Sequence, residues 1–205
     1  MAIFLLSPAY CGGRRAKILM KPGSTIELAR RLDAGTLTLG EAFAFLSGLY
    51  FRGKLAYATA FGRGSAPGDD GAFVITPTRG LLPPSTIVSV STLQEFASVD
   101  VSAADPRYRG PLERDVTSLA ARLTADARVV LLGSIASGKY VDVLVKLLGE
   151  RLHYPPSFVG RGDMSRGGLL LRSVDAGVEL DYDVLEITSL RHGPRPPKLA
   201  PRRTS

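Results

Sequence analysis

The residues best suited to chemistry lie in one glycine-rich turn, which spans residues 133–139 and has the sequence GSIASGK. A short apolar run at residues 129–132 precedes this turn, and apolar residues at helical spacing follow it from Tyr140 to Leu148. The pattern predicts a buried strand, a tight turn and a helix. Because the N–H groups at a helix N-terminus favour anions, we expect the turn to bind phosphate through Lys139 and the backbone near Gly133 and Gly138.

The same turn nearly matches the P-loop of nucleotide hydrolases, since Gly133 is followed after four residues by Gly138 and Lys139. Tyr140, however, stands where those proteins have a Ser or Thr whose hydroxyl binds Mg²⁺. Three interpretations remain open: a degenerate P-loop, a plain connection between strand and helix, or a turn that binds an anion without metal-dependent hydrolysis. We prefer the third, in which Ser134 orients the substrate.

Two further turns follow predicted strands and contain polar or basic side chains. The apolar residues 2–6 lead into Ser7, Tyr10 and Arg14, and the apolar residues 72–75 lead into a turn with Arg79. Because the carboxyl ends of parallel strands meet at one edge of a sheet, we expect these side chains to face the 133–139 turn. They are candidate contacts for phosphate or nucleic acid.

Residues 158–168 form the most unusual polar run in the chain, FVGRGDMSRGG. Asp163 is the candidate carboxylate for activating water or stabilising an oxocarbenium ion, and Ser165 is a candidate for orienting the substrate. Arg161 and Arg166 are candidate phosphate ligands. The alternative interpretation of Asp163 is an N-cap of the following helix.

Residues 39–61 are predicted to be helical, with breaks at Gly48 and Gly53. Aromatic side chains alternate there with basic ones, including Tyr50 and Lys54. Such residues could stack bases and bind phosphates, but aromatic residues at helical spacing more often pack in a core. The remaining predicted elements are helices at residues 24–32, 91–96, 112–123 and 163–172 and an edge strand at residues 178–184.

Composition excludes several classes of protein. The chain has two histidines, one cysteine and no HxE motif, so a zinc site and a disulfide are not expected, and we predict no cofactor. No serine stands in a nucleophile-elbow context. The apolar N-terminus is too short for a signal peptide and no run reaches membrane-spanning length, so we expect a cytoplasmic protein.

The 205 residues, 45% of them hydrophobic, suit one α/β domain over residues 1–190 followed by a tail. We expect three layers, α/β/α, with a mainly parallel sheet. The tail, residues 191–205, contains no acid and is predicted to be disordered. It would either bind nucleic acid weakly or serve only solubility. Its basic residues are Arg191, Arg195, Lys198, Arg202 and Arg203.

Four short segments resemble the YaaA family, which is associated with peroxide stress, and a related family of uncharacterised bacterial and phage proteins. The segments are IFLLSPA at residues 3–9, LSGLY at 46–50, TRGLLPP at 78–84 and GSIASGKYVDVL at 133–144. The resemblance implies a fold similar to that of uracil-DNA glycosylases, and DNA binding or nucleobase processing. This chain is shorter than YaaA, lacks most of the insertion before LSGLY and has a Pro/Arg tail.

These observations lead to one functional hypothesis and its alternatives. The protein is expected to bind a nucleotide or nucleic acid in a phosphate-binding pocket at the carboxyl ends of the strands, as a glycosylase-like enzyme acting on nucleobases or nucleosides. The alternatives are a non-catalytic DNA-binding module of a stress response and, less favoured, the degenerate P-loop protein.

Overall fold

The computed structural model describes residues 2–64, 71–124, 126–136, 138–189, 192–197 and 199. In this part of the chain a six-stranded sheet has the order β3-β2-β1-β4-β5-β6. The central strands are parallel, and the two short edge strands β3 and β6 are antiparallel. The strands are β1 (Ala2–Leu6), β2 (Ala72–Ile75), β3 (Leu81–Leu82), β4 (Arg128–Leu132), β5 (Leu152–Tyr154) and β6 (Asp183–Val184).

The strand order reverses between β1 and β4. The chain passes from β1 to β2 on one side, and later returns to place β4 on the other side of β1, where Leu6 pairs with Leu132. In an open α/β sheet the loops that leave two such neighbouring strands diverge, and a crevice opens beyond their carboxyl ends. The sheet topology therefore selects the ends of β1 and β4 as a place for a ligand.

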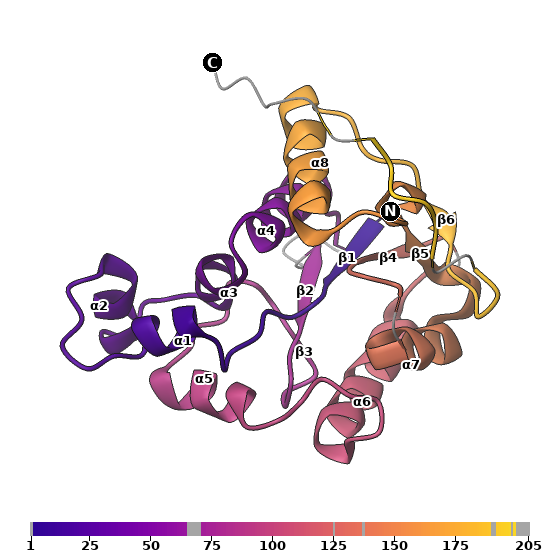
Figure 1. Ribbon diagram of the computed structural model, residues 1–205. Helices are drawn as coiled ribbons and strands as arrows, with labels where there is room; N and C mark the ends of the chain where they lie inside the picture. Colours follow the sequence, from indigo (N-terminus) through magenta and orange to yellow (C-terminus); the bar gives the residue numbers. More distant parts are fainter. Residues whose placement is uncertain are drawn as a thin grey trace.

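Helices cover both faces of the sheet, as Figure 1 shows with α4 and α8 on one side and α6 and α7 on the other. Successive residues of β1 alternate between two cores: Phe4 and Leu6 join one, and Ile3 and Leu5 join the other. The expected mainly parallel α/β architecture is thus confirmed. The helices of the first side include α3 (Leu39–Ser47), α4 (Leu49–Phe61) and α8 (Asp163–Ala176), and those of the second are α6 (Pro106–Arg122) and α7 (Gly138–Leu148).

Three smaller helices extend the first core beyond the sheet. They are α1 (Arg14–Leu19), α2 (Glu27–Asp33) and α5 (Val90–Ala97). Two short 3₁₀ helices, η1 (Gly149–Arg151) and η2 (Pro156–Phe158), flank β5. None of the helices in the described part of the chain is long and apolar enough to span a membrane.

The predicted break at Gly48 is confirmed, but the one at Gly53 is wrong. Gly48 has a φ of 65° and separates α3 from α4, whereas Gly53 lies inside α4. A Cβ on Gly53 would lie 2.7 Å from Gly167 O, and one on Gly167 would lie 2.6 Å from Leu49 O. The two glycines therefore let the backbones of α4 and α8 touch, which brings Lys54 and Asp163 to neighbouring elements.

Several other boundaries differ from the expectation. Residues 14–19 form α1 instead of continuing a turn, and β3 lies in a stretch predicted as a turn. Helix α8 continues to Ala176, and of the predicted edge strand only β6 forms. Ser89 caps α5 through the N–H of Thr92, so this helix begins at Val90, one residue before the predicted start. Short strands and caps such as these depend on neighbouring elements more than on local pattern.

Candidate functional site

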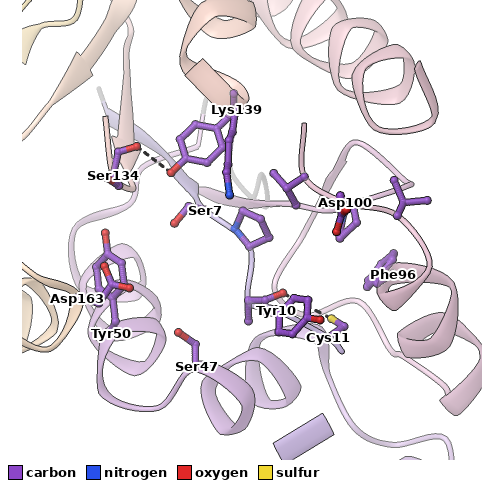
Figure 2. A pocket seen from close by; sticks show the side chains of 16 residues that line it. Ser7, Tyr10, Cys11, Ser47, Tyr50, Phe96, Asp100, Ser134, Lys139 and Asp163 are labelled. Atoms are coloured by element: carbon purple, nitrogen blue, oxygen red, sulfur yellow. Dashed lines mark hydrogen bonds between the residues drawn. The ribbon is translucent and has the colours of Figure 1, made fainter. Parts of the chain in front are cut away.

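A cavity of about 560 Å³ lies beyond the carboxyl ends of β1 and β4. Residues 7–11, the α3–α4 junction, residues 99–101, the start of α7 and the first residue of α8 line it (Figure 2). This volume is in the range of small-molecule sites, and the position is where the strand order reverses. The cavity is therefore the candidate functional site.

Five predicted site residues line this cavity. They come from three separate regions of the sequence: Ser7, Tyr10, Ser134, Lys139 and Asp163. Figure 2 shows the Lys139 side chain extending into the cavity from α7, with Asp163 on the side formed by α4 and α8. Tyr10 is 73% exposed whereas Ser7 is only 6% exposed, so Tyr10 belongs to the rim and Ser7 to the floor.

The absence of a side chain at Gly133 lets Ser7 and Tyr140 pack against its backbone at the cavity. A Cβ at this position would lie 2.9 Å from Ser7 Cβ and 2.9 Å from Tyr140 Oη, closer than side chains tolerate. The hydroxyl of Tyr140 donates a hydrogen bond to Ser134 O at 2.9 Å, and burial raises the pKa of Tyr140 to about 12. This hydrogen bond holds the turn in place. Tyr140 occupies the sequence position at which a P-loop has the hydroxyl that binds Mg²⁺, and its own hydroxyl is bonded to Ser134 O instead.

Asp163 begins α8 and is held by a buried arginine. Its side chain is 68% exposed, and Oδ1 accepts a hydrogen bond from Arg166 Nη1 at 3.3 Å. Arg166 also donates through Nε to Phe158 O at 3.2 Å and lies 5.9 Å from the Phe158 ring centroid. Arg166 therefore positions Asp163 and is not among the residues that line the cavity. The N-cap of α8 is Gly162 rather than Asp163.

The other predicted residues do not line the cavity. Arg161 donates to Ser165 Oγ at 3.2 Å and to Ser157 O at 2.9 Å. Arg79 forms an ion pair with Glu95, and hydrogen bonds from Arg79 lower the pKa of that carboxyl. Arg14 is exposed at the start of α1. These four residues, Arg14, Arg79, Arg161 and Ser165, are thus separated from the site.

The charges that line the cavity are mixed. Among the described lining residues Lys139 is the cation, and Asp100 and Asp163 are the carboxylates. No group of three or more metal-ligating side chains exists within the described ranges. The site consequently combines a lysine at the start of α7 with carboxylates on two other sides.

Lys54 is the residue whose role the sequence did not indicate. It is 1% exposed, and Nζ donates to Ser7 O at 2.6 Å and to Ser7 Oγ at 2.9 Å. Its Nζ lies 4.5 Å from the ring centroid of Tyr50 and 4.7 Å from that of Phe51. Burial lowers the pKa of Lys54 to about 7. Helical spacing placed this lysine in a basic and aromatic helix, but only the packing of α4 on β1 directs its amine at Ser7.

The fold and the cavity define a class: an α/β protein with a ligand-sized cavity where the strand order of a mostly parallel sheet reverses. No family model matches the chain, and neither a curated protein nor a solved structure matches it.

Proposed function

We propose that the cavity binds a nucleotide or the end of a nucleic acid, with a phosphate at the start of α7. The observation that supports this proposal is the meeting of Ser7, Ser134 and Lys139 at one cavity beyond β1 and β4. A lysine and the N–H groups of a helix N-terminus favour the same anion. Tyr10 on the rim offers an aromatic face on which a base can stack.

The proposed reaction is hydrolysis of a bond between a nucleobase and its sugar. Asp163 activates water or stabilises the oxocarbenium ion, and Arg166 keeps its carboxylate in place. The resemblance of four segments to the YaaA family supports this direction, because that family is similar in fold to uracil-DNA glycosylases. The α/β architecture with a mostly parallel sheet is compatible with such a fold.

Binding is tested with Lys139→Ala, compared with Lys146→Ala on the exposed side of the same helix. Isothermal titration calorimetry with inorganic phosphate, nucleoside monophosphates and a short single-stranded oligonucleotide supplies the affinities. Loss of a hydrogen bond to a charged group should weaken binding by about 10- to 100-fold in Lys139→Ala alone. Equal affinities in both variants, or no binding of any of these probes, would contradict the proposal.

Catalysis is tested with Asp163→Asn, with Asp181→Asn as the control at an exposed site away from the cavity. Chromatography of free bases after incubation with nucleosides and oligonucleotides measures turnover. An enzyme should lose base release in Asp163→Asn while its nucleotide affinity persists. If the unmodified protein binds nucleotides yet releases no base, the non-catalytic binding module is the correct alternative.

A further inference from the structure

The buried amine of Lys54 contacts the hydroxyl of Ser7, which lines the cavity. Lys54 is on α4 and is shielded from solvent, and its Nζ lies 2.9 Å from Ser7 Oγ. Ser7 lines the cavity (Figure 2), whereas Lys54 is not among the lining residues. A ligand in the cavity therefore meets the Ser7 hydroxyl, and a ligand atom that lies next to Ser7 Oγ comes within reach of Lys54 Nζ.

The surroundings of Lys54 favour the neutral amine. Within the described ranges no carboxylate forms an ion pair with Lys54. The charged groups that act on it from α8 are Asp163, which raises its pKa, and Arg166, which lowers it, and desolvation outweighs both. A buried ammonium without a counter-ion is costly, so the amine loses its proton near neutral pH.

We propose that Ser7 is a nucleophile activated by Lys54 as its general base, and that the cavity accepts an ester or another activated acyl group. A neutral lysine has a free electron pair that can accept the Ser7 proton, and the 2.9 Å between Lys54 Nζ and Ser7 Oγ is within the range for this transfer. This activity goes beyond nucleotide binding and does not depend on it.

The proposed step is an acyl transfer to water in two stages. Ser7 Oγ forms a bond to the acyl carbon as its proton passes to Lys54 Nζ, and the bond from the acyl carbon to the leaving group breaks. The leaving group takes the proton from Lys54. Water then attacks the acyl carbon as one of its protons passes to Lys54 Nζ. The bond from the acyl carbon to Ser7 Oγ breaks, Oγ takes the proton from Lys54, and the acid is released.

Other contacts keep Ser7 in place for this role. The N–H of Ser7 donates to Leu132 O at 3.2 Å, and its carbonyl accepts from Lys54 Nζ at 2.6 Å. Gly133 has no side chain that would press on Ser7 Cβ. Lys139 lines the same cavity and supplies a positive charge for the developing oxyanion.

The test is covalent labelling of the full chain by a small fluorophosphonate, which reacts with activated serines. Intact-mass and peptide mass spectrometry should find one adduct, at Ser7, in the unmodified protein. The adduct should be absent in Ser7→Ala and unchanged in Ser118→Ala, which alters an exposed serine on α6. Labelling of folded protein elsewhere, or equal labelling of Ser7→Ala, would overturn the proposal.

Lys54→Met separates a general base from a purely structural lysine. The labelling rate should fall by about 100-fold or more in this variant. In the unmodified protein the rate should rise about tenfold per pH unit below neutrality and level off above it, as the amine loses its proton. If Lys54→Met does not fold, this pH profile decides alone, and a flat profile refutes the role of Lys54. Nucleotide affinity, measured separately, shows whether the phosphate site persists in either case.

Discussion

The ionisable amine of Lys54 is buried, and its titration makes the stability of the folded protein depend on pH. Burial lowers the pKa of Lys54 from 10.5 to about 7, so between these values the unfolded chain binds a proton that the folded chain lacks. Stability must therefore rise with pH in this window through Lys54. The contribution is at most about 1.4 kcal/mol per pH unit.

Lys54→Met should remove this pH dependence. The free energy of unfolding by urea, measured at intervals between about pH 6.5 and pH 8.5, should rise with pH in the unmodified protein and change less in the variant. Burial raises the pKa of Cys11 to about 12, so ionisation of the unfolded thiol lowers stability toward the upper end of this window, but it does so in both proteins and cancels in the comparison. Parallel profiles for the two proteins would show that Lys54 keeps an ordinary pKa.

Gly133 packs closely against Ser7 and Tyr140, two residues that line the cavity. Gly133→Ala places a methyl group against Ser7 Cβ and Tyr140 Oη, and we expect a loss of stability of about 1–3 kcal/mol. The same displacement should lower fluorophosphonate labelling of Ser7. Thermal unfolding and labelling of this variant at one pH check both effects, and an alanine accepted without either loss would contradict the close packing of the floor.

The pairing of α4 with α8 is the element-scale feature that builds the site. Gly167→Ala should destabilise the protein by about 1–3 kcal/mol or more, because its Cβ would lie 2.6 Å from Leu49 O and no flexible side chain can yield. Gly168→Ala is the matched control on the same helix. Its Cβ meets only the end of Arg172 at 3.1 Å and Leu199 at 3.7 Å, so the variant should gain up to about 1 kcal/mol of helix propensity.

Chemical denaturation of the two variants measures this difference directly. Equal stability of Gly167→Ala and Gly168→Ala would mean that α4 and α8 do not touch through their backbones. Because Asp163 and Lys54 are on these two helices, Gly167→Ala should also slow labelling of Ser7.

The start of α3 is held by a capping box and an arginine. Thr38 Oγ1 accepts from the Glu41 N–H, Glu41 Oε2 accepts from the Thr38 N–H, and Arg31 donates to both oxygens of Glu41. The hydrogen bonds from Arg31 and Thr38 lower the pKa of Glu41 to about 2. This stabilisation is complete above the ordinary carboxyl pKa and is lost as the pH falls toward 2.

Glu41→Ala should therefore cost about 1–2 kcal/mol at neutral pH and less near pH 2 to 3, where Glu41 becomes protonated in the unmodified chain. Urea unfolding at the two pH values tests this. If the loss of unfolding free energy in Glu41→Ala is the same at both pH values, it comes from helix packing and not from the charge of Glu41.

At the scale of the whole molecule, the basic residues after position 190 are not among the residues that line the cavity, the last of which in the sequence is Asp163. Arg161 donates to Pro197 O at 3.4 Å, so residues 192–197 contact the segment that precedes α8. Eight of the fifteen tail residues lie outside the described ranges, and the predicted disorder remains a prediction. Deleting residues 191–205 should reduce sequence-independent DNA affinity and its salt dependence.

Fluorescence anisotropy with a random duplex at several salt concentrations measures this effect. Five fewer cations should make the slope of log affinity against log salt shallower, by at most about 0.9 for each phosphate that the tail neutralises in the full chain. Nucleotide binding in the cavity should not change, because the lining residues belong to the preceding part of the chain. If the shortened chain has the same slope of log affinity against log salt concentration, the tail does not bind DNA and serves only solubility.

Local patterns were sufficient for the strongly periodic elements. The apolar run before Gly133 and the helix from Tyr140 onward were predicted from spacing, and β4 and α7 occupy those residues. The break at Gly53 was wrong because a glycine inside a helix has the same local pattern whether it ends the helix or meets Gly167. The strand β5 has three residues, too few for a periodicity to be recognised.

The sequence by itself determined that β1 and β4 end in polar turns and that Ser7, Ser134, Lys139 and Asp163 are candidates for one site. Only the tertiary structure decided that these residues meet, that Arg14, Arg79 and Arg161 do not join them, and that Lys54 contacts Ser7. The physical reason is that helix and strand periodicity selects a buried face but not the partner on it. The partner of Lys54 is set by the packing of α4 against β1 and α8, over a separation of 47 residues between Ser7 and Lys54.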